Sequence, residues 1–149
     1  MSIWTHCSGV IRLDAVRYDK KDSLTKKDFN KIFIQSTWHK YNENCNMPQG
    51  DEGSIEYSLN ISDDLDCVAN AYVLTFTGDL RSYNNIDEII EWWKSIPQLI
   101  ENLQAETNKS CYIRDGSMVV YTEFSSEATL LGFVDDCMIS QKISIPESQ

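Results

Sequence analysis

The sequence predicts an α+β domain of the ferredoxin-like (split βαβ) kind, which is an antiparallel sheet with two helices on one face, here with extra strands at the C-terminal end. Three observations predict this fold. Several segments have the two-residue period or the continuous apolar character of strands, and two segments have the signals of helices. Their order is strand, helix, strand, strand, helix, strand, and right-handed crossovers make the split βαβ its simplest topology.

The first predicted strand spans residues 3–16. Ile11 and Leu13 would face one side of this strand and Arg12 the other, as the two-residue period requires. Gly9 is expected to mark a bulge in it.

A short helix is expected after the first strand. Thr25 and Asp28 have the spacing of a capping box, so the helix would begin there and end near Thr37. Residues 38–53 follow without any period and are rich in Asn and Gly. A loop of about 15 residues is uncommon in a compact domain and is a candidate functional segment.

Two strands are predicted to form an antiparallel hairpin in the middle of the chain. Residues 54–61 alternate between apolar and polar side chains, which indicates a strand with one solvent-exposed face. Residues 68–76 are apolar on both faces, which is typical of a central strand. Gly78 and Asp79 are expected to end this strand, and the turn between the two strands falls on residues 62–66.

The strongest helix signal follows this central strand. Asn85 and Glu88 have the spacing of a capping box. Apolar residues then recur at the steps of one helix face, at Ile86, Ile89, Ile90, Trp93, Ile96, Ile100 and Leu103. Pro97 is expected to kink the helix or to divide it in two. Trp92 lies off this stripe, so we expect it either as a rim residue packed on a loop or as a partly exposed anchor for another protein.

Further strands are predicted after this helix. Asp115-Gly116 between two β-rich segments predicts a two-residue hairpin turn, and residues 129–134 predict a strand or a short helix. From about residue 136 the pattern fades, and the tail is expected to be loose or an edge strand. We expect residues 1–149 to form a single domain.

The sequence lacks most patterns that catalysis, cofactor binding or membrane insertion requires. Its six glycines form no phosphate-binding loop, and no apolar stretch approaches 18 residues. His6 and His39 have no cysteine at zinc-ligand spacing. Five scattered cysteines favour free thiols in a reducing cytoplasm. We therefore expect a cytoplasmic protein that is not an enzyme and needs no cofactor, with a thiol enzyme (Cys7 or Cys45 with His39) and a metal-dependent hydrolase as alternatives.

The net charge of −10 is unevenly distributed. Residues 1–40 have eight basic and four acidic side chains, whereas the remaining residues have five basic and nineteen acidic ones. Such an acidic excess repels nucleic acid and attracts basic proteins. Ordinary solubility is the alternative explanation, and the basic N-terminal stretch is better explained as a solvated or self-association surface than as a nucleic-acid site.

Several short segments occur together in this chain: Trp4-Thr5-His6, Met47-Pro48, Ala71-Tyr72, Gly78-Asp79-Leu80-Arg81 with Tyr83, and Glu88-Ile89-Ile90-Glu91-Trp92. In this combination the chain resembles a family of short proteins encoded by phages and prophages of Gram-positive bacteria. The resemblance extends to about Glu123 and supplies no catalytic residues. It implies a class of protein that includes inhibitors of host defence, anti-CRISPR proteins among them.

These observations lead to a functional hypothesis. We expect an inhibitor of a bacterial defence system, most specifically an anti-CRISPR protein whose acidic surface binds a Cas effector or another basic host nuclease. The expected partner-binding residues are Asp51, Glu52, Asp79, Arg81, Tyr83, Asp87, Glu91 and Trp92. An immunity protein against a nuclease toxin, a small metal-dependent nuclease and a phage accessory protein are the alternatives. We expect no direct contact with nucleic acid, and the sequence leaves open a homodimer formed through the C-terminal segments.

Overall fold

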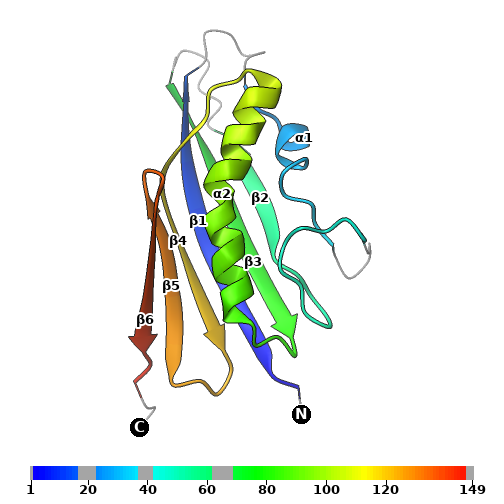
Figure 1. The fold of residues 1–149 in the computed structure, drawn as a ribbon, viewed down its shortest axis with the longest axis vertical. Helices are drawn as coiled ribbons and strands as arrows, with labels where there is room; N and C mark the ends of the chain where they lie inside the picture. The colour runs from blue at the N-terminus through cyan, green and yellow to red at the C-terminus, as the bar shows by residue number, and fades with distance from the viewer. Residues whose placement is uncertain (1, 17–22, 37–41, 62–68, 147–149) are drawn as a thin grey trace.

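One antiparallel sheet and one long helix form most of the fold (Figure 1). The computed structural model describes residues 2–16, 23–36, 42–61 and 69–146. The strands are β1 (Trp4–Val16), β2 (Glu56–Ile61), β3 (Ala69–Arg81), β4 (Tyr112–Thr122), β5 (Glu127–Val134) and β6 (Cys137–Ser144). The helices are α1 (Lys26–Phe29) and α2 (Ile86–Thr107).

The sheet has six strands in the order β2-β3-β1-β4-β5-β6, and every neighbouring pair is antiparallel. β1 lies between β3 and β4, and β2 and β6 form the two edges. The predicted hairpin of the middle of the chain is confirmed, since β2 pairs with β3. Its turn at residues 62–66 lies outside the described residues. The tail was predicted to be either loose or an edge strand, and it forms an edge strand, β6.

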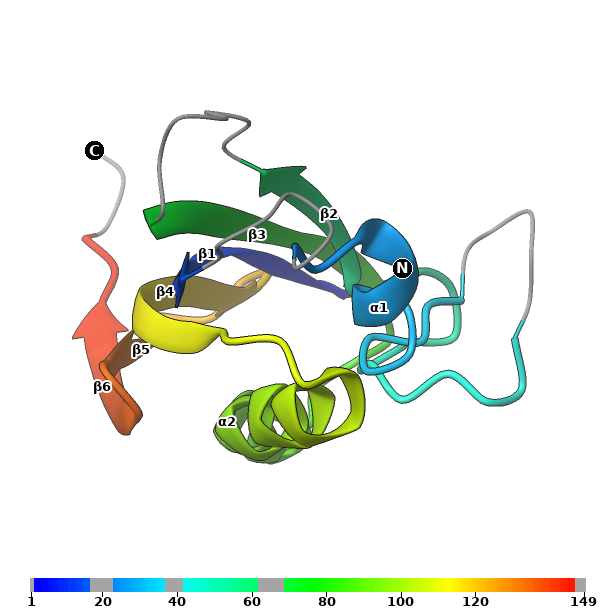
Figure 2. The same ribbon diagram turned by 90° about the horizontal axis from the view of Figure 1, so that it is seen from above.

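The predicted ferredoxin-like fold is wrong, although the elements up to β4 follow the predicted order. That fold places two helices side by side on one face of the sheet, whereas α1 is a single turn and the sheet continues into β5 and β6. Figure 2 shows α2 alone beneath the middle of the sheet, with the short α1 to one side.

The capping box of Thr25 and Asp28 is formed, but α1 ends at Phe29 and not near Thr37. A distant side chain explains the early end. Asn46 accepts a hydrogen bond from the Ile34 backbone N–H (2.9 Å) and donates one to the Ile32 carbonyl (2.8 Å). These backbone groups are therefore satisfied outside a helix.

The predicted hairpin turn at Asp115-Gly116 is also wrong, because both residues lie inside β4. Asp115 pairs with Arg12 of β1, and a register shift between Arg12 and Leu13 absorbs the irregularity. Neither neighbour of β1 shows a register shift at Gly9, so the bulge expected there is absent. The extra residue lies instead in β4, where Arg114 has no register partner on β1. Staying extended lets β4 pair with β1 on one side and β5 on the other.

Two further boundaries differ from the prediction. β3 continues through Gly78 and Asp79 to Arg81, and the chain turns at Ser82, whose φ is 53°. A Cβ atom at Gly78 would lie 3.0 Å from the Ile55 Cα, so glycine here permits a close approach of two backbones. α2 continues as one helix through Pro97, so of the two predicted effects of this proline, a kink or a division into two helices, the division does not occur.

The core lies between α2 and the sheet and is largely aromatic. Trp93 stacks on Phe133 with ring centroids 4.8 Å apart, and Phe76 meets both Trp92 and Trp93 edge-on. The expectation that Trp92 lies at the rim or is partly exposed is wrong, since only 7% of it is exposed. Phe33 packs on Phe76 and widens the core beyond the apolar stripe of α2.

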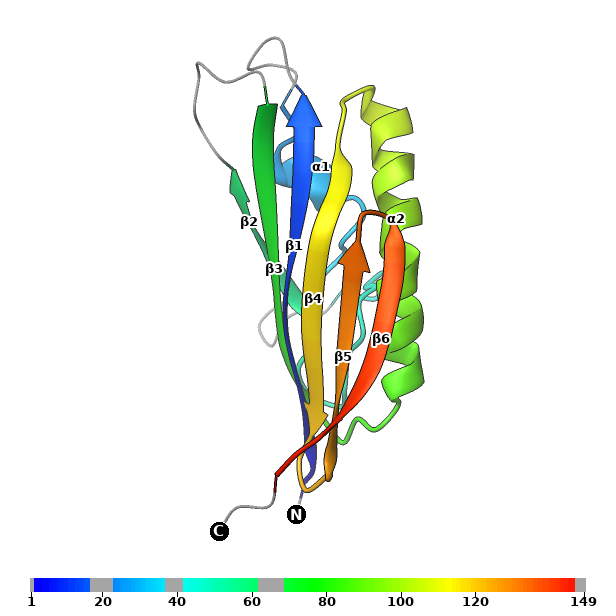
Figure 3. The same cartoon turned by 90° about the vertical axis from the view of Figure 1, so that its left-hand side faces the viewer.

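The two faces of the sheet differ in what covers them. Figure 3 shows the sheet from the side, with α2 along one face and β6 at the edge. We call the other face the open face. It carries the even-numbered side chains of β1 and the side chains opposite them on β3 and β4. Among the described helices, none is long and apolar enough to cross a membrane.

Candidate functional site

A histidine joins three strands at one end of the open face. His6 lies on β1 opposite Asp79 of β3 and Tyr121 of β4. Its Nδ1 lies 2.6 Å from Asp79 Oδ1, and its Nε2 lies 3.0 Å from Glu123 Oε1. Glu123 follows β4 directly, and its backbone N–H donates to the Trp4 carbonyl (2.9 Å).

This geometry favours the protonated form of His6. A neutral imidazole has one N–H donor, so two simultaneous hydrogen bonds to carboxylates require the imidazolium ion. The pKa of His6 is raised above its usual value, first by the hydrogen bond to Asp79 and then by the one to Glu123. Partial burial opposes this shift but does not reverse it.

A hollow of about 650 Å³ opens on the sheet beside His6. Ser8 and Thr77 face each other across β1 and β3 in this hollow, and both side chains are short. The larger side chains around them are Trp4, His6, Glu56, Asp79, Val119 and Tyr121. The hollow therefore combines aromatic rings with two carboxylates. Asp79 is already paired with His6, so Glu56 is the carboxylate that could receive an organic cation beside these rings.

The loop before β2 packs on the end of β3 beside this hollow. Arg81 accepts a hydrogen bond from the Asp51 N–H (3.0 Å), and its own N–H donates to the Glu52 carbonyl (2.9 Å). Its guanidinium also lies 2.6 Å from Glu52 Oε1. Gly53 has a φ of 77°, and a Cβ atom there would lie 1.9 Å from the Asp79 carbonyl oxygen. Glycine thus lets the loop bring Asp51 and Glu52 next to Asp79.

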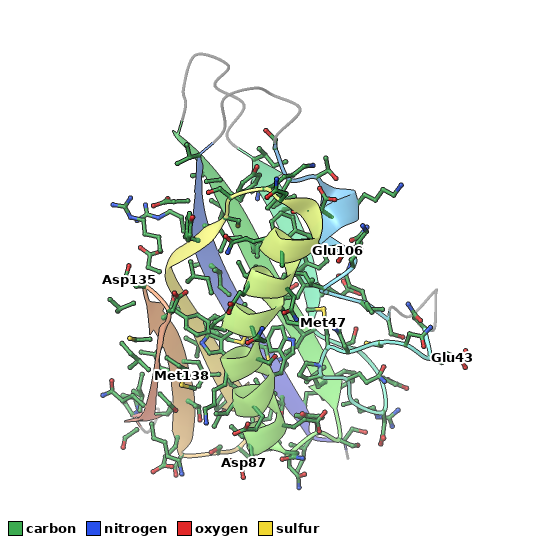
Figure 4. The ribbon with its side chains drawn as sticks, turned by 45° about the horizontal axis from the view of Figure 1, so that its top comes forward. Glu43, Met47, Asp87, Glu106, Asp135 and Met138 are labelled. Atoms are coloured by element: carbon green, nitrogen blue, oxygen red, sulfur yellow. The ribbon has the colours of Figure 1, made fainter. Side chains whose placement is uncertain are left out.

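Carboxylates from several segments meet at this end of the molecule, where β1 begins and β3 ends. The first turn of α2 adds Asp87 and Glu88, and β5 begins there with Glu127. Figure 4 shows Asp87 at this end of α2 and Glu106 at the opposite end. We call this set of residues the acidic end: Asp51, Glu52, Asp79, Asp87, Glu88, Glu123 and Glu127.

The structure brings together five of the eight predicted partner-binding residues, namely Asp51, Glu52, Asp79, Arg81 and Asp87. The other three do not present a binding group there. Tyr83 and Trp92 are each only 7% exposed, and burial raises the pKa of the Tyr83 phenol. Glu91 lies one turn further along α2, where it pairs with Lys94 at 3.5 Å.

The sequence interpretation missed the residues that organise this end. It considered His6 as a zinc ligand and as part of the Trp4-Thr5-His6 segment, and it assigned no binding role to Glu56, Tyr121 or Glu123. Alternation along β1 would have placed His6 on the same face as Arg12. The strand register that brings Asp79 and Glu123 to His6 is not visible in one sequence.

Two of the described thiols are poorly suited to the thiol-enzyme alternative. Burial raises the pKa of the Cys7 and Cys111 thiols to about 12, so neither is a ready nucleophile. Cys45 is partly buried, and His39, its suggested partner, lies outside the described residues. Across the described part of the chain, no three His, Cys, Asp or Glu side chains are placed to hold one metal ion.

Comparison with known proteins gives no further assignment. The chain matches no family model, no curated protein and no solved structure. A function for this chain is therefore inferred from the residues and the geometry of the acidic end.

Proposed function

We propose that this protein is a stoichiometric inhibitor of a bacterial defence system, most specifically an anti-CRISPR protein that binds a basic Cas effector through its acidic end. The observation that carries this proposal is the convergence of seven carboxylates from separate segments of the chain on one end of the sheet. The biological context comes from the resemblance of the sequence to phage-encoded proteins. The comparisons with known proteins add nothing to that resemblance.

The clustering of these carboxylates favours binding over mere solubility. His6 and Arg81 offset part of the charge of these seven carboxylates, and the remainder is a local excess that a chain needing charge only for solubility could distribute over its surface. A local excess of negative charge instead speeds the encounter with a basic protein and orients it. Binding by charge also predicts that salt weakens the complex.

The hollow supplies a place for a partner's side chain. Glu56 and Asp79 line it, and Trp4 and Tyr121 contribute aromatic rings. A guanidinium group can stack on an aromatic ring while it donates hydrogen bonds to a carboxylate. We therefore expect an arginine of the partner to enter the hollow and to account for much of the affinity.

A pull-down with matched variants tests this proposal. The acidic-end variant combines Asp51→Asn, Asp79→Asn and Asp87→Asn. The control variant combines Glu43→Gln, Glu101→Gln and Asp136→Asn, which are exposed, lie on other parts of the molecule and remove the same charge.

We expect the wild type and the control variant to recover the same basic nuclease from host lysate at low salt, and to lose it at about 0.5 M salt. The acidic-end variant should recover none. Failure of the wild type to recover any protein, or equal recovery by the two variants, would contradict the proposal. Recovery of a toxin nuclease in place of a defence protein would favour the immunity protein.

A nuclease assay addresses the enzymatic alternative. We expect no cleavage of DNA or RNA by the purified protein with Mg²⁺ or Mn²⁺. Cleavage by the wild type that is lost in the acidic-end variant would show that the protein is a nuclease and not an inhibitor.

A further inference from the structure

β6 (Cys137–Ser144) forms an unusually regular free edge of the sheet. It pairs with β5 along its whole length without a register shift, and it contains no proline. Seven of its eight residues are exposed, and Lys142 is its one charged residue. Natural proteins usually protect such an edge with charges, prolines or bulges, because a regular edge readily pairs with another strand.

The apolar residues of β6 are exposed for a structural reason. Ile139 and Ile143 are 49% and 42% exposed and lie on the open face. The residues opposite them on β5 are Gly132 and Ala128, whose small side chains leave the two isoleucines uncovered. A strand added beyond β6 would cover them from the other side.

The hydrogen-bond pattern of β6 determines how it can pair. The backbone N–H of Ile145 donates to the Ser126 carbonyl (2.8 Å), so this residue directs its backbone groups toward β5. Backbone groups alternate in direction along an antiparallel strand. The even-numbered residues of β6 therefore direct their N–H and C=O groups outward: Met138, Ser140, Lys142 and Ser144.

We propose that β6 pairs with β6 of a second copy of this chain, antiparallel, about a twofold axis at Gln141. The even-numbered residues, whose backbone groups point outward, must then pair with even-numbered residues of the second copy. The register centred on Gln141 forms four such pairs. It also places Ile139 of each copy opposite Ile143 of the other. A register centred on Ser140 would place Ile139 opposite Gln141 and lose the apolar pairs. A register centred on Lys142 would place the two Lys142 side chains opposite each other, and like charges in that position are destabilising.

The charge distribution is compatible with this arrangement. β6 ends beside Glu127, at the level of the acidic end. Antiparallel pairing therefore places the two acidic ends at opposite ends of a joined sheet, which limits the repulsion between two chains of net charge −10. The edge of one strand is smaller than a standard interface of about 800 Å² per partner, so we expect dimerisation to depend on concentration.

Sedimentation velocity tests the dimer. The edge variant combines Ile139→Lys and Ile143→Lys, and its matched control combines Val16→Lys and Ile61→Lys, which are similarly exposed apolar positions on β1 and β2. We expect the wild type and the control to shift from monomer to dimer between roughly 5 and 500 µM. The edge variant should remain monomeric, and a wild type that is monomeric throughout would overturn the proposal.

A cysteine cross-link tests the register without disturbing the fold. Residues facing each other as a non-hydrogen-bonded antiparallel pair have Cα atoms about 4.5 Å apart, which suits a disulfide. In a Cys137→Ser background, Gln141→Cys should give a covalent dimer on oxidation. Ser140→Cys, one residue away, should not, because its counterpart in the second copy is Lys142.

Equal cross-linking at both positions, or at Ser140 alone, would overturn the proposed register. The outcome can be distinguished from that of the proposed function, because β6 contains none of the three carboxylates that the acidic-end variant changes. A monomer that still binds its nuclease through the acidic end would reject only the dimer.

Discussion

The two faces of the sheet come from the same strands but have opposite characters. On the covered face, Trp93, Phe133 and Phe76 pack ring against ring under α2. On the open face, neighbouring strands meet through ion pairs and hydrogen bonds, as between Arg12 and Asp115 at 2.9 Å. Alternation along each strand thus separates a layer that holds the fold from a layer that is free to bind.

The largest expected effect is on the covered face. Trp93→Ala removes a fully buried ring that stacks on Phe133 and whose indole N–H donates to the Gly132 carbonyl (3.3 Å). We expect the free energy of unfolding to fall by about 3–5 kcal/mol, measured by urea denaturation. Val10→Ala on the open face, where Val10 is 38% exposed, should cost less than about 1 kcal/mol. Similar losses of unfolding free energy in both variants would contradict the claim that the covered face, and not the open face, holds the fold.

An intermediate effect is expected at His6, and it depends on pH. The folded protein raises the pKa of His6, so the stability that its two ion pairs contribute is complete below about 6.5, the pKa of an unperturbed histidine. This contribution is lost as pH rises through the pKa of His6 in the folded state. The difference in urea midpoint between the wild type and His6→Gln should therefore be largest near pH 6 and shrink toward pH 9. A difference that grows with pH would mean that the imidazolium is not the stabilising form.

The smallest effect is expected for the exposed ion pair between Arg12 and Asp115. Both side chains are about half exposed, and exposed pairs of this kind typically contribute under about 1 kcal/mol. A double-mutant cycle with Arg12→Gln and Asp115→Asn should give a coupling energy within that limit. A coupling above about 2 kcal/mol would show that the open face also holds the fold.

The elements predicted correctly are those whose signal is local. The β2–β3 hairpin and the existence of α2 follow from periods of two and of three to four residues. The errors arose where distant residues compete with a local signal. The turn signal at Asp115-Gly116 is overridden by pairing with β1 and β5, and the helix signal after Thr25 is overridden by the side chain of Asn46.

The acidic end was only partly predictable for the same reason. Asp79 and Asp87 lie near each other in the chain. Asp51 and Glu52 belong to the long loop of residues 38–53, which was predicted as a candidate functional segment. His6 and Glu123 are 117 positions apart and meet only because β1 pairs with β4. Trp92 was predicted at the surface because the packing of Phe33 on Phe76, and of Phe76 on Trp92, cannot be inferred from the period of one helix.

The most direct test of the central claim is a plasmid-interference assay in cells that carry an active CRISPR–Cas system. We predict that the wild type and the variant with Glu43→Gln, Glu101→Gln and Asp136→Asn both restore plasmid transformation. The variant with Asp51→Asn, Asp79→Asn and Asp87→Asn should leave interference intact while it folds to the same extent. Interference that is unaffected by the wild type, or that is blocked equally by both variants, would contradict binding through the acidic end.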